Sequence, residues 1–305
     1  MDRDEFIITV FCLVCEHYQV IKNTYPLRRG GFAPALSDEE VLTLEICGEY
    51  FKLATDKDLL TYFRTHYAHF FPHLTDRTLF VRQAANLWQV KAAIQHRLTQ
   101  ASGQAADPVQ IIDTLPLPVC VYTRSGRDRC FKPFADYGHC AAKKLDYHGF
   151  KLGLRITRCG MITAWPLLPA RPHDIQLLDD LVAGFAGLVP ADKGFIDAYR
   201  QALLAERHGV VVVTAPRKRM TSSHSPALLK LCARLRKGVE TVGSHLTERF
   251  AVARLRVPDL WHFQHRLIRK VLAHTIGVFL NLQLHRPPLD LDGLVTLEPQ
   301  QRVAP

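Results

Sequence analysis

Three acidic residues stand at positions where their carboxylates could gather at one edge of a sheet. Asp113 follows the β-rich run Val109–Ile112, Asp192 follows the apolar run Leu188–Ala191, and Glu240 lies in an amphipathic stretch that begins at Pro226. In open sheets, functional side chains collect at the carboxyl ends of strands, where they leave the ladder and face a crevice. We therefore expect the two aspartates to end neighbouring strands and a helical Glu240 to face them.

Such a set of carboxylate oxygens would suit a hard cation, Mg²⁺ or Mn²⁺. Close carboxylates repel one another unless cations lie between them, and two metal ions roughly 3.5–4 Å apart can activate an attacking oxygen and stabilise a leaving one. Each acid also has a structural interpretation, because strand-end aspartates often form turns and Glu240 could simply pair with Arg236 on its own helix. We interpret two further acids as cap or turn residues and keep a third as the substitute for Glu240: these are Asp174, Asp197 and Glu248.

The elements that must position these acids alternate between strands and helices. After Val109–Ile112, the pattern predicts strands at 150–157 and 161–168, a helix at 175–185 capped by Asp174, a strand at 188–191, a helix at 198–207, a strand at 210–214 and a long helix from Pro226. Consecutive strands followed by β-α-β crossovers predict an α/β fold with a mixed sheet flanked by helices.

The first hundred residues are predicted to be helical. Ser37 and Glu40 form a capping-box pattern, Thr55 with Asp58 repeats a cap, and Thr75 opens a third helix. Short helices whose last member is cationic are typical of a helix-turn-helix-like DNA-binding module, although a helical bundle used for dimerisation explains the pattern nearly as well. The cationic residues in question are Arg77, Arg82, Lys91 and Arg97.

A small, polar stretch, Ala101–Asp107, separates the helical segment from the alternating one and is interpreted as a linker. It divides the chain into a helical domain at 1–105 and a catalytic domain at 106–285. The proline-rich residues 286–305 are expected to form a flexible tail.

Positive charge is concentrated late in the chain. The net charge is +10, and residues 201–275 alone hold 14 Lys or Arg against 4 Asp or Glu. Such concentration is typical of a surface that binds a polyanion and favours nucleic acid as the partner.

Membrane and exported classes are not favoured. The longest apolar stretches are too short to span a bilayer, and the N-terminus is acidic where a secretory signal would be basic. We expect a cytoplasmic, nucleoid-associated protein without membrane contact. The Cys12-x-x-Cys15 pair has no second pair at zinc-ribbon distance and is predicted to pack inside a helix.

At this point several sequence blocks resemble the bacterial insertion-sequence DDE transposases, most closely the insertion sequence 982 group. The resemblance extends from about Ser37 to about Leu280. It rests on Ile112–Cys120, His148–Gly153, Pro172–Asp174, Ala191–Phe195, Thr214–Lys218 and the Arg236-x-x-x-Glu240 spacing. The chain departs from the family pattern at Ala233, Gly243 and Thr247 around Glu240, and at Phe195.

The resemblance implies an RNase H-like catalytic domain in which Asp113, Asp192 and Glu240 hold two Mg²⁺ ions, or Mn²⁺. It implies a transposase that acts as a homodimer, cleaves double-stranded DNA at the ends of its element and joins the freed 3′-hydroxyls to target DNA. A catalytically silent, domesticated DNA-binding protein and an RNase H-like nuclease remain alternatives, and short inverted repeats flanking the gene would favour transposition. The candidate phosphate contacts are Arg77, Arg82, Lys143, Lys144, Lys193, Arg217, Lys218, Arg236 and Lys237.

Overall fold

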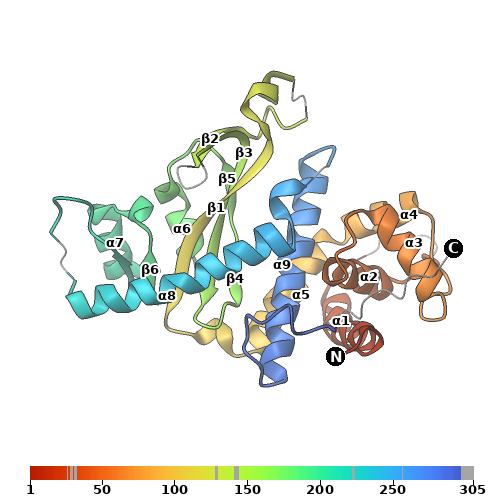
Figure 1. Cartoon of the computed structure of the whole chain (residues 1–305). Coiled ribbons are helices and arrows are strands. Elements are labelled where there is room, and N and C mark those ends of the chain that lie inside the picture. The colour runs from red at the N-terminus through yellow and green to blue at the C-terminus, as the bar shows by residue number, and fades with distance from the viewer. Residues whose placement is uncertain are drawn as a thin grey trace. The chain divides into compact units, whose positions relative to one another are not determined.

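The computed structural model describes residues 1–25, 27, 30, 33–127, 130–140, 144–221, 224–255 and 257–296. The chain divides into two compact units (Figure 1). Unit 1 comprises Met1–Leu98 and Gln264–Pro305, and unit 2 comprises Thr99–Phe263. The helical unit is therefore built from two separate stretches of chain, one on each side of the sheet unit in sequence.

Helices form unit 1, and local capping chemistry sets where several of them begin. The Ser37 capping box is confirmed, with the Glu40 N–H donating to Ser37 Oγ and the Ser37 N–H donating to the Glu40 carboxylate. Thr55 also caps its helix, whereas the third helix is capped by Asp76 rather than Thr75. The helices are α1 (Arg3–Thr24), α2 (Asp38–Tyr50), α3 (Asp56–His66), α4 (Arg77–Asn86), α5 (Trp88–Ala101) and α9 (Leu260–Gln283), of which α5 and α9 extend across the boundary of the two units.

A buried cluster of charges ties α9 to the N-terminal helices. Arg269 of α9 contacts Glu49 at 2.6 Å and Asp56 at 3.1 Å, and its side chain is only 4% exposed. Lys91 of α5 pairs with Glu45 of α2, donates to the Ala84 carbonyl and lies 2.8 Å from the Nδ1 atom of His265. Carboxylates and cations thus compensate one another inside the helical unit.

Unit 2 contains a mixed sheet. Three strands pair antiparallel in the order β1-β3-β2, the short β4 and β5 also pair with β3, and β6 pairs parallel with β7. A parallel bridge between Val109 and Leu188 connects β1 to β6. The strands are β1 (Gln110–Val121), β2 (Asp136–Cys140), β3 (Leu145–Thr157), β4 (Ile162–Ala164), β5 (Leu167–Pro169), β6 (Gly187–Ala191) and β7 (Val210–Thr214).

Helices flank this sheet, and α8 (Pro226–Ser244) passes over β1 (Figure 1). Remaining helices are α6 (Leu178–Val182) and α7 (Ala198–His208). Shorter helical turns are η1 (Gln104–Ala106), η2 (Tyr122–Arg127), η4 (Asp174–Leu177), η5 (Lys193–Phe195), the π-helix η6 (His245–Arg249) and η7 (Val252–Arg254). A helical N-terminal region followed by a mixed sheet with helices confirms the predicted RNase H-like fold class.

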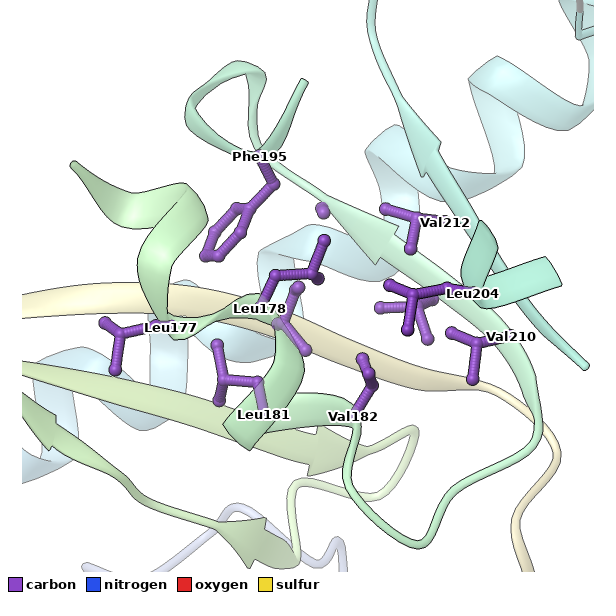
Figure 2. Packing of buried hydrophobic residues seen from close by; sticks show 11 residues of the cluster. Leu177, Leu178, Leu181, Val182, Phe195, Leu204, Val210 and Val212 are labelled. Atoms are coloured by element: carbon purple, nitrogen blue, oxygen red, sulfur yellow. The ribbon is translucent and has the colours of Figure 1, made fainter. Parts of the chain in front are cut away.

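A cluster of buried apolar side chains fixes the part of the sheet where the candidate acids emerge. Figure 2 shows Leu178, Phe195 and Val212 from three different elements converging in it. Ile112 and Ala191 belong to the same cluster and are almost fully buried. Because each of these two residues immediately precedes a candidate aspartate, the core holds the backbone of both acids.

Two predicted elements differ from the structure. Strand β1 continues well past Ile112, so Asp113 lies within the strand rather than at its end, and Pro116 and Pro118 are part of the ladder with β3. The prolines are tolerated because this stretch lies beyond the bridge to β6 and has its ladder partner on one side. The predicted helix at 175–185 is instead η4 followed by the short α6, and His173 rather than Asp174 takes the N-cap position.

The C-terminal segment also differs from the expected organisation. Residues 264–283 group with the N-terminal helices, not with the sheet unit. In the described part of the expected tail, Leu291 and Leu294 are buried, and the terminal amine of Met1 donates to the Leu294 carbonyl at 3.1 Å. Apolar residues between the prolines account for this packing.

Candidate functional site

Neighbouring strands bring Asp113 and Asp192 together. Val109 and Leu188 form the parallel bridge between β1 and β6. Asp113 follows Val109 by the same number of residues as Asp192 follows Leu188. Adjacent strands lie about 4.8 Å apart, so residues in register on parallel strands are neighbours. The two aspartates therefore reach the same level of the sheet, as their sequence positions predicted.

Burial changes the acidity of Asp113. Desolvation and, to a smaller extent, the carboxylates of Asp192 and Asp174 raise the pKa of Asp113 to about 6. The N–H of Thr114, which donates to Asp113 Oδ1 at 2.9 Å, and the charge of Arg236 act in the opposite direction. A carboxylate in such surroundings gains from any further cation placed beside it.

Asp192 has a cationic partner on α8. The Arg236 Nη1 atom lies 3.1 Å from Asp192 Oδ1, and the side chains are 22% and 48% exposed, respectively. Helix α8 thereby presents a positive charge to the pair of aspartates. The structure does not contain the Arg236–Glu240 pair that was the structural interpretation of Glu240.

Asp174 is a third acid near Asp113 and Asp192, although its sequence position suggested only a cap or turn residue. Its Oδ1 atom accepts a 2.7 Å ion pair from Lys151, whose ammonium also donates to the Pro172 carbonyl at 2.9 Å. Its Oδ2 atom lies close to Gly194, two residues after Asp192. A Cβ atom built on Gly194 would be only 2.8 Å from this oxygen. Asp174 thus contacts the Asp192 loop, and the Pro172–Asp174 block was the signal that could have marked it.

Glu240 is not among the groups that shift the pKa of Asp113, and its side chain is exposed. It has no hydrogen bond or ion pair with a described residue. Glu240 lies one helical turn after Arg236 and just before Gly243. Arg236 contacts Asp192, and a Cβ atom built on Gly243 would lie 3.8 Å from Leu115 of β1. The structure therefore places Glu240 one helical turn from Arg236, in solvent and without a described contact to either aspartate.

The other two acids have different surroundings. Asp197 caps α7 by accepting from the Arg200 N–H, which confirms its interpretation as a cap. Glu248 is exposed in the π-helical turn η6 beyond the end of α8.

Basic residues surround Asp192. Lys193 follows it directly, and Arg217 donates to the Lys193 carbonyl at 3.1 Å. Arg217, Lys218, Lys193 and Lys237 are exposed, as are Arg77 and Arg82 on α4. Lys144 is exposed at the start of the β3 hairpin, and Lys143 lies outside the described residues.

One predicted basic residue proves to be structural. Lys91 was expected on the cationic face of the helical segment, but it is 1% exposed and burial lowers its pKa to about 8 despite the neighbouring Glu45. Its charge compensates buried Glu45 and cannot contact DNA.

The donor chemistry at the aspartates fits a hard cation. Asp113, Asp174 and Asp192 lie near one another, and their nearby cations are Arg236 and Lys151, so acids outnumber bases. Carboxylate oxygens are the ligands that Mg²⁺ prefers. In the described part of the chain, no three His, Cys, Asp or Glu side chains lie close enough to hold an ion together.

The match with known protein families decides between the classes that this geometry allows. Residues 103–257, just over half of the chain, match the transposase DDE domain. The chain belongs to this DDE transposase family. No curated protein matches the sequence.

Family membership makes the chain a member of a group of DNA-processing enzymes. The matched residues fall within unit 2 and include the aspartate pair, Asp174 and Glu240. Divalent metals and DNA are the general cofactors and substrate of DDE transposases, which agrees with the acid surplus and the surrounding bases. No helix in the described residues has the length and apolarity to cross a membrane.

Proposed function

We propose that this DDE transposase is the enzyme of an insertion sequence of the 982 group, and that it cleaves the ends of its element and joins the 3′-hydroxyls to target DNA. The observation that carries the proposal is the pair Asp113 and Asp192, in register on neighbouring parallel strands and with Arg236 acting on both carboxylates. A structural role would favour compensated acids, because uncompensated buried charge is costly.

In this proposal Asp113 and Asp192 share the metal ions, and the buried residues before each acid keep the two carboxylates in place. Two bound Mg²⁺ ions, or Mn²⁺, would supply activation of the attacking oxygen and stabilisation of the leaving oxygen. Arg236 neutralises Asp192 until the site is loaded and then contacts a phosphate. Lys151 and Asp174 fix the turn at Gly194 and so orient Asp192.

Glu240 is the third ligand in this proposal. Its exposed side chain has no partner among the described residues and lies one helical turn from Arg236, which contacts Asp192. In the metal-bound enzyme this side chain would turn toward the aspartates. Glu248 would have to reach the site from beyond the end of α8.

Phosphate contacts are assigned to the exposed bases around Asp192 and to those on α4. Lys193, Arg217, Lys218 and Lys237 accompany Arg236 near the cleaved strand. Phosphate contacts are also assigned to Lys143 and Lys144 on the sequence alone. Arg77 and Arg82 suggest that unit 1 binds the element ends, while unit 2 performs catalysis. Processing two ends at once favours a homodimer, acting on the nucleoid in the cytoplasm.

Strand cleavage of a labelled duplex that carries the DNA flanking the gene tests this function. We expect cuts at the element ends with Mg²⁺, none with EDTA, and none with Asp192→Asn. Asp197→Asn is the matched control, because it removes a carboxylate only five residues away while an asparagine still caps α7.

Specific binding without cleavage would refute the catalytic function and leave a silent DNA-binding protein. Cleavage of many unrelated duplexes without joining would indicate a nuclease. Absence of specific binding would refute the assignment of DNA ends as the substrate.

A second comparison identifies the third acid. Glu240→Gln is expected to abolish cleavage and Glu248→Gln to leave it within about threefold, because only the former lies one helical turn from Arg236, the partner of Asp192. The reverse result would transfer the role to Glu248.

A further inference from the structure

The sheet face that carries Asp113 continues to an open end lined by tyrosines. On β3, side chains alternate, so Leu154 and His148 share one face. Asp113 pairs with Leu154, and Tyr137 of β2 pairs with His148. On β1 a bulge between Pro118 and Cys120 keeps this face aligned, because Cys120 also pairs with His148.

From Leu154 to His148 this face is buried, and exposed side chains follow only at the tyrosines. Near Asp113 it is covered by α8, whose Gly243 approaches Leu115. Further along β3, the ring of Phe150 packs against Phe263 at 5.1 Å and Phe131 at 6.1 Å. Beyond Phe150, His148 is still buried, and the strands then lead into the segment between β1 and β2 (Figure 1).

Tyr122 and Tyr137 form an exposed pair there. Their ring centroids lie 5.1 Å apart with 50° between the planes, and the residues are 56% and 39% exposed. The ring of Tyr137 also packs edge-on to His148 at 5.2 Å. The two contacting rings therefore offer aromatic surface to solvent at this end of the sheet.

Hydrogen bonds hold this pair in place. The buried Ser125 hydroxyl lies 2.6 Å from the Tyr122 carbonyl and 3.0 Å from the Tyr137 hydroxyl. Because Ser125 donates to the carbonyl, the Tyr137 hydroxyl donates to Ser125. The rings are thus ordered before any partner arrives, which reduces the entropic cost of binding.

Charge around the pair matches a polyanion. Residues 121–144 contain six Lys or Arg against two Asp. Among the described residues of this segment, Arg124, Lys132 and Lys144 are exposed. Aromatic faces among cations are the combination that binds single-stranded nucleic acid, since bases stack on the rings and phosphates pair with the cations.

We propose that Tyr122 and Tyr137 form a stacking platform for unpaired bases of DNA. The proposal deepens the proposed function, because it gives the strand that leaves the cleavage site a binding place on the same sheet face. Bases inside a duplex already stack on one another, so unpaired bases are the ligand.

Binding to a fluorescent single-stranded oligothymidine, in the absence of divalent metal, tests the platform without depending on the element's sequence or on catalysis. Tyr122→Ala and Tyr137→Ala are each expected to weaken binding about 5- to 100-fold, the range of losing one base–aromatic stack. Tyr122→Phe and Tyr137→Phe keep the rings and should stay within about threefold. Affinity for a fully paired duplex should change less than about twofold in all four.

Tyr199→Ala is the matched control, since Tyr199 is 81% exposed on α7 away from the pair. Equal losses for single-stranded and paired DNA, an equal loss in Tyr199→Ala, or no single-strand binding by the unmodified protein would overturn the platform. So would loss of self-association with unchanged DNA binding, which would identify the pair as an interface between copies. Failure of cleavage alone would refute only the proposed function.

Discussion

Two clusters of charge in this protein are built in opposite ways. In unit 1, Glu45, Glu49 and Asp56 face an equal or larger number of cations and are almost fully buried. In unit 2, Asp113, Asp174 and Asp192 face fewer cations, and Asp192 is half exposed. The cations of the first cluster compensate its carboxylates and hold the helices together. The second has more carboxylates than ion-paired cations, a balance that would favour a bound cation.

Removing an acid from the second cluster should produce the largest effect. Asp113→Asn is expected to lower end cleavage at least about 1,000-fold, as loss of a residue that acts within a catalytic unit does. Gel-based cleavage in Mg²⁺ measures it. Retention of more than a tenth of the activity would show that Asp113 is not a ligand.

Removing a cation from the first cluster should cost stability rather than activity. Arg269→Met is expected to reduce the free energy of unfolding by about 3–5 kcal/mol, because it leaves buried carboxylates uncompensated. The affected partners are Glu49, Asp56 and Glu45, whose charges hold the pKa of Arg269 above its usual value although burial alone would lower it.

Denaturant unfolding followed by circular dichroism measures this cost. Arg77→Met, an exposed change on α4, is the control, and Glu49→Gln added to Arg269→Met should restore part of the loss. An unfolding midpoint equal to that of the unmodified protein would show that the network contributes nothing.

Removing the Asp113 carboxyl should raise the free energy of unfolding, whereas removing the Arg269 cation lowers it, and the effect should depend on pH. The carboxyl's folded pKa of about 6 exceeds the unfolded value, so ionisation of Asp113 in the metal-free protein costs stability as pH rises from about 4 to about 6. Asp113→Asn should therefore be more stable than the unmodified protein above pH 6, by up to about 3 kcal/mol at 1.36 kcal/mol per pKa unit.

Below about pH 4 this difference should disappear, because the carboxyl is then protonated in both states. Thermal unfolding at a series of pH values in EDTA measures it. A difference that does not change with pH would contradict the assigned desolvation.

The smallest effect is expected for the arginine of the second cluster. Arg236→Gln should change the free energy of unfolding by less than about 1 kcal/mol, because its partner Asp192 is 48% exposed and water screens the pair. Comparing the free energies of unfolding of Arg236→Gln and Arg269→Met shows how burial changes the cost of losing an arginine–carboxylate contact of similar length. Equal costs would refute the distinction between the clusters.

Local chemistry explains what the sequence could predict. The Ser37 and Thr55 caps depend on residues a few positions apart, and both were predicted correctly. The strand–helix alternation placed Asp113 and Asp192 on neighbouring strands because apolar periodicity determines both elements.

The predictions that the structure contradicts concern residues whose partners are distant in sequence. Lys91 looked like one more surface cation, and nothing nearby shows that Glu45 would enclose it. Asp174 resembled a helix cap, whereas its contacts with Lys151 and Gly194 arise only when the sheet forms. The first strand was predicted to end at Asp113, because the sequence does not show that the chain continues in a ladder with β3.

The division of the helical unit between two stretches of chain has a consequence for synthesis. A ribosome makes α1 to α4 first, then the whole sheet unit, and only then most of α9. Until Arg269 emerges, the carboxylates of Glu49 and Asp56 lack their buried partner, so the early helices cannot reach their final packing. We expect nascent chains halted before α9 to remain sensitive to protease in their first hundred residues. Copies of the gene truncated before α9 should likewise yield no stable helical fragment that could compete with the full-length protein for DNA.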